Sequence, residues 1–521
     1  MKQPRYETVS LEKIVGGGQA LGTLKDGRKC FVWGGLPGET VVFRVTKKKA
    51  HFVEGVVTEV LTAALERTKP RDPDSYLSTS PWQIMNFDAE QHYKAALIEE
   101  AFELHDIVLP NPIDIFTDRR EFHYRNKVEF SWYGDKVALN LAPQLHSQDN
   151  LEHSEDALTS DEAITTRETL DLAFFRRGSK GKIVVDGTSL ANDNINQLAR
   201  AIRDLLRTKP VSARSLKTLL IRCNQQGKCV WQLYLKDDEL PELITPTEAA
   251  NLPAQGGEII YSDPRSPASR ITKRLAKFGD TTLTDTILGT PFRYACEGFF
   301  QVNVPVYEQA LRDMSEWAED FSVSDSTSAQ TQETEKSERA NLDHTSSNLA
   351  SQSRKSSHFQ DNPERSGAVL ANRDDAEASG TQKVLDLYSG VGTIGLTIGG
   401  DNVTLVEINE HAVAEMRRNI AALGRTSARA ILAPSEKALD YITDSEIVTV
   451  DPPRAGLHVD VIATLLQKAP PRIIYLSCNP VTQARDVALL AEKYGIRAHR
   501  GYNFFPRTPH IEHLVILDRI A

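Results

Sequence analysis

Residues 383–395 read KVLDLYSGVGTIG, a short apolar run that ends in a glycine-rich loop and continues into a helical pattern. This arrangement is typical of the first strand-to-helix turn of a doubly wound α/β sheet. The chain after it repeats the alternation, with strand-like runs that end near Glu407, Asp451 and Cys478 and with amphipathic helical runs between them. We therefore predict that residues 382–521 form a mostly parallel, Rossmann-like sheet that binds ligands at the carboxyl ends of its strands.

Two modules and an insertion precede this predicted sheet. Residues 1–66 contain short β-branched runs separated by Gly, Asp-Gly and Pro-Gly turns, which predict a small β-barrel. Residues 67–320 mix strand-like and helical runs and predict a central α+β domain. Residues 321–381 are rich in Ser, Thr, Gln, Asn, Asp, Glu and Ala and lack Trp, Tyr, Ile, Met and Cys. Such a segment buries too little apolar surface to offset its ordering entropy, so we expect a disordered surface insertion.

The composition is that of a soluble globular protein of several domains. The chain has 521 residues and a net charge of -10, and no apolar run approaches the roughly 20 residues of a membrane-spanning helix. The amino-terminal stretch lacks the apolar core of a signal peptide. The five cysteines are scattered and form no CxxC pair, so they suggest neither a disulfide framework nor a zinc site. We expect a cytoplasmic monomer without a membrane partner.

Positive charge is concentrated in two places despite the acidic total. Residues 1–60 carry ten Lys/Arg against six Asp/Glu, and residues 265–277 hold five Lys/Arg with no acid between them. Either stretch could bind phosphates, but composition alone fits a solvated basic face equally well or better.

The glycine loop and the next strand predict a site for an adenosine-containing cofactor. Glycines let the backbone approach a ligand closely, and Glu407 at the end of the following strand is placed to bind ribose hydroxyls. A dinucleotide site and a merely structural tight turn are the rival interpretations. The acidic Asp386 inside the first strand and the motif at 451–454 favour S-adenosylmethionine over a dinucleotide.

Asp451-Pro452-Pro453-Arg454 follows a later strand and predicts a rigid bend over the reacting group. An isolated Pro-Pro pair would more simply mark the end of a strand. Methyltransferases that act on amines commonly place an aromatic residue after the prolines to stack on the base. Arg454 stands at that position here, which argues against methylation of a nitrogen.

Cys478 ends the strand after that, in the sequence Ser-Cys-Asn-Pro. A lone cysteine is most often an inert core residue, but this one lies at the predicted ligand-binding edge of the sheet. C5 of uracil is too poor a nucleophile to attack a sulfonium methyl group directly. A thiolate that adds to C6 turns the ring into an enolate whose C5 is reactive, so a cysteine beside the methyl donor suits this chemistry.

Glu512, on the last strand, is the candidate general base. The proton on C5 must leave after methylation and before the thiolate is eliminated. Without Cys478, a carboxylate facing solvent on a half-exposed strand would be the default interpretation of Glu512. We expect its neighbours His510 and His513 to be structural.

Five motifs occur together in an order that resembles the RNA 5-methyluridine methyltransferase family: GFFQVNVPVYEQAL, LDLYSGVGTIG, DPPRAG, SCNP and FFPRTPHIEHLV. The resemblance implies a class I methyltransferase domain, S-adenosylmethionine as the methyl donor and an RNA substrate. It also implies that residues 1–60 are a TRAM domain, an oligonucleotide-binding barrel, and that YRNKVEF at 124–130 is a motif of the middle domain. By this resemblance Cys478 is the nucleophile and Glu512 the base, and the cofactor contacts are Gln301, Tyr388, Thr393, Glu407 and Asp451.

Two features depart from the family pattern. Many relatives carry a four-cysteine iron-sulfur cluster after the TRAM domain, but residues 67–86 contain no cysteine, so we expect no cluster and no other metal. The insertion at 321–381 is unusually long, and it precedes the first cofactor-binding strand, where it can loop out of the sheet. The TRAM-like module favours ribosomal RNA over transfer RNA as the substrate. The alternatives are methylation of an RNA nitrogen and a non-catalytic RNA-binding protein.

Overall fold

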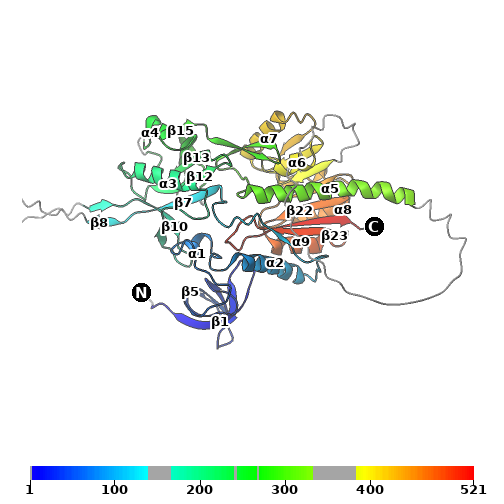
Figure 1. Ribbon diagram of the computed structural model, residues 1–521. Coiled ribbons are helices and arrows are strands. Elements are labelled where there is room, and N and C mark those ends of the chain that lie inside the picture. The colour runs from blue at the N-terminus through cyan, green and yellow to red at the C-terminus, as the bar shows by residue number, and fades with distance from the viewer. Residues whose placement is uncertain (1–2, 139–165, 240–242, 267–268, 332–382, 521) are drawn as a thin grey trace, which may run out of the picture.

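The computed structural model describes residues 3–138, 166–239, 243–266, 269–331 and 383–520. A closed barrel forms the amino-terminal part, drawn in blue in Figure 1, and this confirms the barrel expected from the sequence. Alternate side chains of its strands point inward, and Phe43 lies in the barrel core. A Cβ atom on Gly55 would lie 2.2 Å from the Phe43 ring, so only glycine fits there. The strands, in spatial order, are β1 (Tyr6–Ile14), β2 (Ala20–Thr23), β3 (Lys29–Trp33), β5 (Phe52–Thr62) and β4 (Thr40–Lys48).

The central part is built on a 7-stranded sheet that is antiparallel except for one pair. Helix α3 (Asp193–Leu206) lies on this sheet, and its buried Ile195, Leu198 and Ile202 belong to the same core as the strands. A short helix, α4 (Pro246–Ala250), contacts the last two strands. The strands, in spatial order, are β11 (Lys182–Val184), β10 (Asp171–Phe175), β7 (Lys127–Tyr133), β12 (Leu216–Cys223), β13 (Cys229–Leu235), β14 (Gly256–Tyr261) and β15 (Lys273–Gly279).

Two small hairpins accompany the central sheet. One consists of β8 (Lys136–Ala138) and β9 (Thr166–Glu168). The other consists of β16 (Thr282–Ile287) and β17 (Thr290–Ala295) and leads toward the carboxyl-terminal part, where β17 contacts helix α7 (Glu410–Ala422). The second hairpin therefore links the two large sheets.

The carboxyl-terminal part is an 8-stranded sheet with the expected doubly wound character. Strand β18 (Val384–Leu387) lies inside this sheet and pairs in parallel with β19 (Val403–Glu407) on one side and β21 (Ile447–Val450) on the other. Such a switch point opens a crevice at the carboxyl ends of the strands. The strand β24 runs antiparallel to both of its neighbours. The strands, in spatial order, are β20 (Arg429–Leu432), β19 (Val403–Glu407), β18 (Val384–Leu387), β21 (Ile447–Val450), β22 (Arg472–Ser477), β24 (Glu512–Arg519), β23 (Tyr494–Tyr502) and β6 (Ile115–Phe116).

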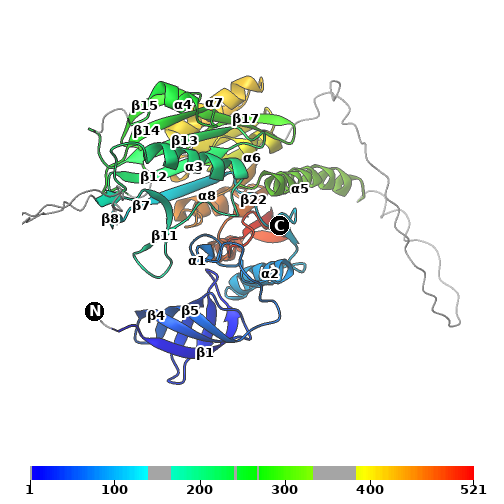
Figure 2. The same ribbon diagram turned by 60° about the vertical axis from the view of Figure 1, so that its left-hand side comes forward.

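Helices cover both faces of this sheet (Figures 1 and 2). On one side lie helices α5 (Val304–Thr331), α6 (Thr393–Ile398) and α7, and on the other α8 (Val459–Lys468), α9 (Pro480–Leu490) and α2 (Phe87–Glu103). Two single turns, η1 (Ser435–Lys437) and η2 (Leu439–Tyr441), follow β20. Among the described residues, no helix is both long enough and apolar enough to cross a membrane.

Residues 87–116 pack on the carboxyl-terminal sheet, although they lie within the segment that the sequence assigned to the central domain. Helix α2 (Phe87–Glu103) contacts α9, and β6 pairs with β23 at the edge of the sheet. Ile98 and Phe102 of α2 are fully buried in the same core as Ile511. The apolar periodicity of α2 predicts a helix, but it does not identify the sheet against which the helix packs.

A buried network of charges fastens α2 to the chain just before β24. Glu90 and Lys94 have fully buried side chains and form an ion pair of 3.0 Å. Lys94 donates to the side chain of Asn503 and to the Phe505 carbonyl, and Glu90 accepts from the backbone N–H of Arg507. Because every one of these partners lies in residues 503–507, the network determines the path of that segment.

The barrel also contacts the chain just after this segment, at Pro509. The indole N–H of Trp82 donates to the Gly18 carbonyl over 3.1 Å. A Cβ atom on Gly18 would lie 2.2 Å from Cβ of Pro509, and Gly18 has a φ of +90°. Only glycine therefore allows the turn between β1 and β2 to lie against Pro509 and Trp82.

The predicted insertion begins later than the sequence suggested. Helix α5 continues to Thr331, so residues 321–331 are helical rather than part of a disordered segment. Val306, Tyr307 and Leu311 bury the first turns of α5 in the core, and a helix that is already nucleated propagates at low cost into polar residues. The rest of the expected insertion, residues 332–381, lies outside the described residues.

We predict that Glu90→Gln loosens residues 503–511, because the substitution leaves the buried Lys94 ammonium without its counter-charge. The free energy of local opening should fall by about 3 to 5 kcal/mol. Amide hydrogen exchange of residues 503–511 measures this. Glu99→Gln, an exposed substitution on the same helix, is the matched control and should leave exchange unchanged. Equal protection in both variants would contradict the proposed constraint.

Candidate active site

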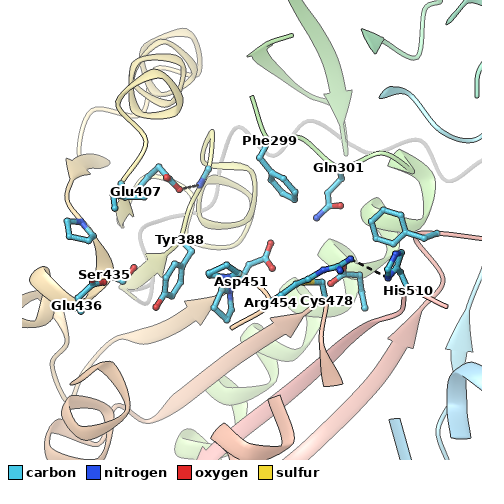
Figure 3. Close-up of a pocket in the computed structure, with 17 residues that line it drawn as sticks. Phe299, Gln301, Tyr388, Glu407, Ser435, Glu436, Asp451, Arg454, Cys478 and His510 are labelled. Carbon is cyan, nitrogen blue, oxygen red and sulfur yellow. Dashed lines mark hydrogen bonds between the residues drawn. The ribbon is translucent and has the colours of Figure 1, made fainter. Parts of the chain in front are cut away.

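A cavity of about 570 Å³ lies at the carboxyl ends of the strands of the carboxyl-terminal sheet (Figure 3). Its walls come from the loops that follow β18, β19, β20, β21 and β22, from the segment before α5, and from the approach to β24. The lining residues are Phe299, Gln301, Tyr388, Gly390, Glu407, Ile408, Pro434, Ser435, Glu436, Asp451, Pro452, Pro453, Arg454, Cys478, Phe505, His510 and Glu512. All the candidate site residues from the sequence are among them except Thr393.

A buried carboxyl group on β18 bonds to the helix that follows the glycine loop. Asp386 is fully buried, and it accepts hydrogen bonds from the Gly395 N–H and from the Thr449 hydroxyl, each over 2.9 Å. Burial raises the pKa of Asp386 to about 7. Tyr388, with a φ of 65°, and Gly392, with a φ of 90°, adopt left-handed conformations that turn the chain from β18 into α6. The strained Tyr388 backbone directs its ring into the cavity (Figure 3).

Glu407 and Gln301 stand at two sides of the cavity. One oxygen of Glu407 accepts from the Gly390 N–H over 3.0 Å, and the other accepts from the Asn409 N–H over 2.7 Å. This fixes the carboxylate at the tip of β19, where it can accept bonds from ligand hydroxyls. The backbone carbonyl of Gln301 accepts from the Asn126 side chain over 2.9 Å, and the Gln301 amide group points into the cavity (Figure 3).

Thr393, which the family resemblance assigns to the cofactor site, lies behind the glycine loop, and its cofactor contact stays a prediction. It is the first residue of α6, it is buried, and it does not line the cavity. Its backbone carbonyl accepts from the Thr397 hydroxyl over 2.6 Å. Thr393 therefore supports the wall behind the glycine loop.

Cys478 and Glu512 meet at the other end of the cavity. Cys478 is half-buried, whereas the other cysteines are buried in the barrel or the central part. Burial raises the pKa of its thiol to about 11, and the carboxyl group of Glu512 acts in the same direction. Glu512 is 4% exposed, and its burial, reinforced by the charge of Asp451, raises its own pKa well above the usual value. Burial also raises the pKa of Asp451, to about 7.

This arrangement suits nucleophilic and base catalysis on one bound ring. A thiol lies beside a buried carboxyl group whose raised pKa makes it a stronger proton acceptor than an ordinary glutamate. Within the described part of the chain, no cluster of His, Cys, Asp or Glu side chains is arranged to hold a metal ion.

The comparisons with known proteins agree with this geometry. Residues 436–520, which include Asp451, Cys478 and Glu512, match the model of the tRNA (uracil-5-)-methyltransferase family. An uncharacterised RNA methyltransferase of Nitratidesulfovibrio vulgaris is 26% identical, with 98% of this chain and 95% of the relative covered. A second one, from Enterococcus faecalis, is 23% identical and covers 96% of this chain and 95% of its own. The carboxyl-terminal part of this chain is thus similar to the uracil-5 RNA methyltransferases, and its full-length relatives are named RNA methyltransferases.

A solved structure shares the fold of this chain over almost its whole length. The crystal structure of the Pyrococcus abyssi tRNA (uracil-54, C5)-methyltransferase, in complex with S-adenosyl-L-homocysteine, has a TM-score of 0.65. It is 18% identical and covers 98% of this chain and 100% of its own. The enzyme class and the methyl donor expected from the sequence agree with the family.

Several lining residues of this methyltransferase were not singled out from the sequence. Phe299 is 67% exposed and lies beside Gln301, within a motif that the sequence analysis quoted only as a whole. Ser435 and Glu436 enter from the turn η1, which carries no recognisable pattern. An exposed aromatic residue next to a motif is a signal that could have been used for Phe299.

The two histidines near Glu512 lie in different surroundings, and for His510 the expectation of a structural role stays a prediction. His513 is fully buried and bonds Gln483 and His499, as a structural residue does. His510 instead lines the cavity. It precedes β24 and follows Pro509, so the alternation of the strand does not govern its direction.

We predict that iodoacetamide alkylates Cys478 slowly at neutral pH and about tenfold faster for each pH unit until the pH approaches 11. A raised thiol pKa means that the reactive thiolate appears only as the pH rises through that value. In Glu512→Gln the plot of alkylation rate against pH should move to lower pH. The substitution removes a carboxyl group that raises the pKa of the Cys478 thiol. Mass spectrometry of the Cys478 peptide measures the rate, and Asp460→Asn, an exposed change, is the control. A flat pH profile would contradict the assigned environment.

Proposed function

We propose that this protein transfers a methyl group from S-adenosylmethionine to C5 of a uridine in structured RNA, through a covalent bond between Cys478 and C6. The observation that carries the proposal is the presence of Cys478 and Glu512 in one cavity with Tyr388 and Glu407. The solved relative, a tRNA (uracil-54, C5)-methyltransferase, supports the reaction class.

The cavity divides into two regions that suit the two substrates. Tyr388, Glu407, Ser435 and Glu436 gather at one end, and Cys478, Arg454 and His510 gather at the other (Figure 3). We assign the first end to the cofactor, with Glu407 accepting bonds from ribose hydroxyls and the Tyr388 ring offering an apolar face. Gln301 and Asp451 lie between the ends and would hold the cofactor near its methyl group. S-adenosylmethionine supplies an electrophilic methyl group on a sulfonium ion.

Cys478 begins the reaction by adding to C6 of the uracil ring. As the sulfur–carbon bond forms, the thiol proton passes to water in the open cavity, and the C5=C6 electron pair moves toward C4 and O4. C5 of the resulting enolate would then be the nucleophile for the methyl group, whose bond to the sulfonium sulfur would break with its electron pair remaining on S-adenosylhomocysteine, the leaving group. The raised thiol pKa means that a positive charge near the sulfur would favour this step, because it stabilises the thiolate.

Glu512 completes the reaction by removing the proton from C5. The electron pair of that C–H bond re-forms the C5=C6 double bond, and the C6–S bond breaks to release the Cys478 thiolate. A glutamate with a raised pKa is suited to this step. Target uridines in structured RNA are usually stacked, so the base must be turned out into the cavity, as other base-modifying enzymes do.

Two alternatives remain distinguishable by experiment. Methylation of a nitrogen would need no cysteine, so activity that survives Cys478→Ala would favour it. A non-catalytic RNA-binding role would be favoured if calorimetry detected no binding of S-adenosylmethionine. The barrel favours ribosomal RNA, whereas the solved relative acts on tRNA. Mapping 5-methyluridine in both RNA classes from a deletion strain decides between them.

We predict opposite behaviour for the two catalytic residues. Cys478→Ala should abolish both methylation and covalent attachment to RNA. Glu512→Gln should still allow addition and methyl transfer but slow the loss of the C5 proton, so a methylated enzyme–RNA adduct should accumulate. Denaturing electrophoresis with labelled RNA detects it. Wild-type enzyme with 5-fluorouridine RNA is the positive control, because fluorine cannot leave as a cation. Product release by Glu512→Gln at the wild-type rate would assign the base to another residue.

The RNA is proposed to contact the barrel and a basic loop of the central part. Residues 176–181 join β10 to β11, and Arg177 of this loop lies 4.0 Å from the centre of the Trp33 ring of the barrel. Arg176 and Lys180 are exposed beside it, and Lys48 and Lys49 are exposed on the barrel. Lys47, by contrast, pairs with Glu54 over 2.6 Å and is less available to a phosphate.

We predict that neutralising Arg176, Lys180, Lys48 and Lys49 together with glutamine weakens RNA binding and flattens its dependence on salt. Each lost phosphate contact should reduce the slope of log K against log salt by about 0.7 to 0.9. Fluorescence anisotropy across a salt series measures this. Lys468→Gln, an exposed change at the end of α8 away from the cavity, is the control. An unchanged slope would mean that these cations are only a solvated face.

A further inference from the structure

The guanidinium group of Arg454 holds the His510 ring on the cavity wall. Its Nδ1 lies 3.3 Å from Nη2 of Arg454, and the ring of Phe505 meets it edge to face, with the ring centres 5.9 Å apart. The backbone N–H of His510 donates to the Thr508 hydroxyl over 3.3 Å, which fixes the turn. Figure 3 shows Arg454 reaching across the cavity floor to His510, with Cys478 close to both.

The contact with Arg454 determines which nitrogen of His510 carries the proton. A guanidinium group only donates hydrogen bonds, so Nδ1 must accept, and the proton of the neutral ring must be on Nε2. Burial, with the charge of Arg454 second, lowers the pKa of His510 to about 4, so the ring is neutral at physiological pH. The other charged groups that act on it, Lys94, Arg125 and Arg177, are all cationic and favour the neutral form as well.

The Nε2–H group of His510 is available to a ligand. In the part of the chain that the structure describes, none of the hydrogen bonds involves His510 Nε2, although the ring lines the cavity beside Cys478. A neutral imidazole with a fixed tautomer and a free N–H is a donor that cannot turn into an acceptor while Arg454 stays in place.

We propose that His510 donates its Nε2–H to O4 of the target uracil, and that Arg454 makes His510 a donor by fixing its tautomer. This rests on the proposed function and names the residue that selects the base. Cytosine has an amino group at C4, which is also a hydrogen-bond donor. With cytosine in the cavity, two donors would face each other and the Nε2–H of His510 would have no acceptor. A buried donor left without an acceptor costs about 1 to 3 kcal/mol, which is about 5- to 150-fold in rate.

The same hydrogen bond contributes to the rate. When the Cys478 sulfur bonds to C6, negative charge develops on O4, and a donor placed there binds the enolate more strongly than the ground state. The proton stays on His510 throughout, and Arg454 behind the ring strengthens its N–H as a donor. His510 is thus a substrate-contacting residue and Arg454 a positioning residue.

The test compares His510→Leu, which removes the donor, with His510→Gln, which keeps an N–H donor. Adduct formation is followed on RNA with 5-fluorouridine at the target. His510→Leu should form the adduct about 100- to 1000-fold more slowly than wild type, and His510→Gln should recover at least about tenfold of this loss. Calorimetry should give the same dissociation constant for S-adenosylmethionine in all three proteins, which shows that the cofactor end is intact.

A base that lacks O4 separates hydrogen bonding from a merely structural role. RNA with 5-fluoro-2-pyrimidinone at the target keeps C5, C6 and the fluorine but has no O4. Wild type and His510→Leu should attack it at rates within about twofold of each other, because the atom that His510 contacts is absent. A His510→Leu variant that is equally slow on both bases, or as fast as wild type on 5-fluorouridine, would overturn the inference. Absence of any wild-type adduct would instead overturn the proposed function.

Discussion

The parallel register of β18 with its two neighbours sets where the cavity lies. Leu387 at the end of β18 pairs with Val406 of β19 and with Val450 of β21. The residues that follow these three in the chain are Tyr388, Glu407 and Asp451, so they lie at one level along the edge of the sheet. The chain therefore needs no long loop to bring these side chains together, and a slip in the pairing would separate them.

The sequence predicted best the positions of residues that directly follow a strand. Tyr388, Glu407, Asp451 and Cys478 each follow an apolar run directly, so the alternation of strands and helices is enough to put them at one edge. Their chemical roles stay proposals, but their convergence in one cavity follows from the fold.

What the sequence did not predict depends on contacts between distant segments. Phe299 reaches the cavity only because the hairpin β16–β17 delivers the chain to the start of α5, and Ser435 enters from a turn without a motif. His510 was not identified as a cavity-lining residue, because its neighbours lie on a strand while it lies before one. Helix α2 was assigned by its place in the chain, yet its buried face fits a sheet whose strands, apart from β6, lie several hundred residues later. Local patterns carry no information about such partners.

The contact of Gly18 with Pro509 determines whether the barrel can be separated from the carboxyl-terminal part without loss of structure. Pro509 is the residue before His510, so the barrel rests against the turn that carries one wall of the reaction site. The barrel thus supports that wall, in addition to the RNA-binding role proposed for it. Removing it would leave the Trp82 indole without the Gly18 carbonyl and would uncover the Pro509 turn. A chimaera that joined this catalytic part to a different RNA-binding module would lack that support. The barrel and the catalytic part are therefore best regarded as one structural unit.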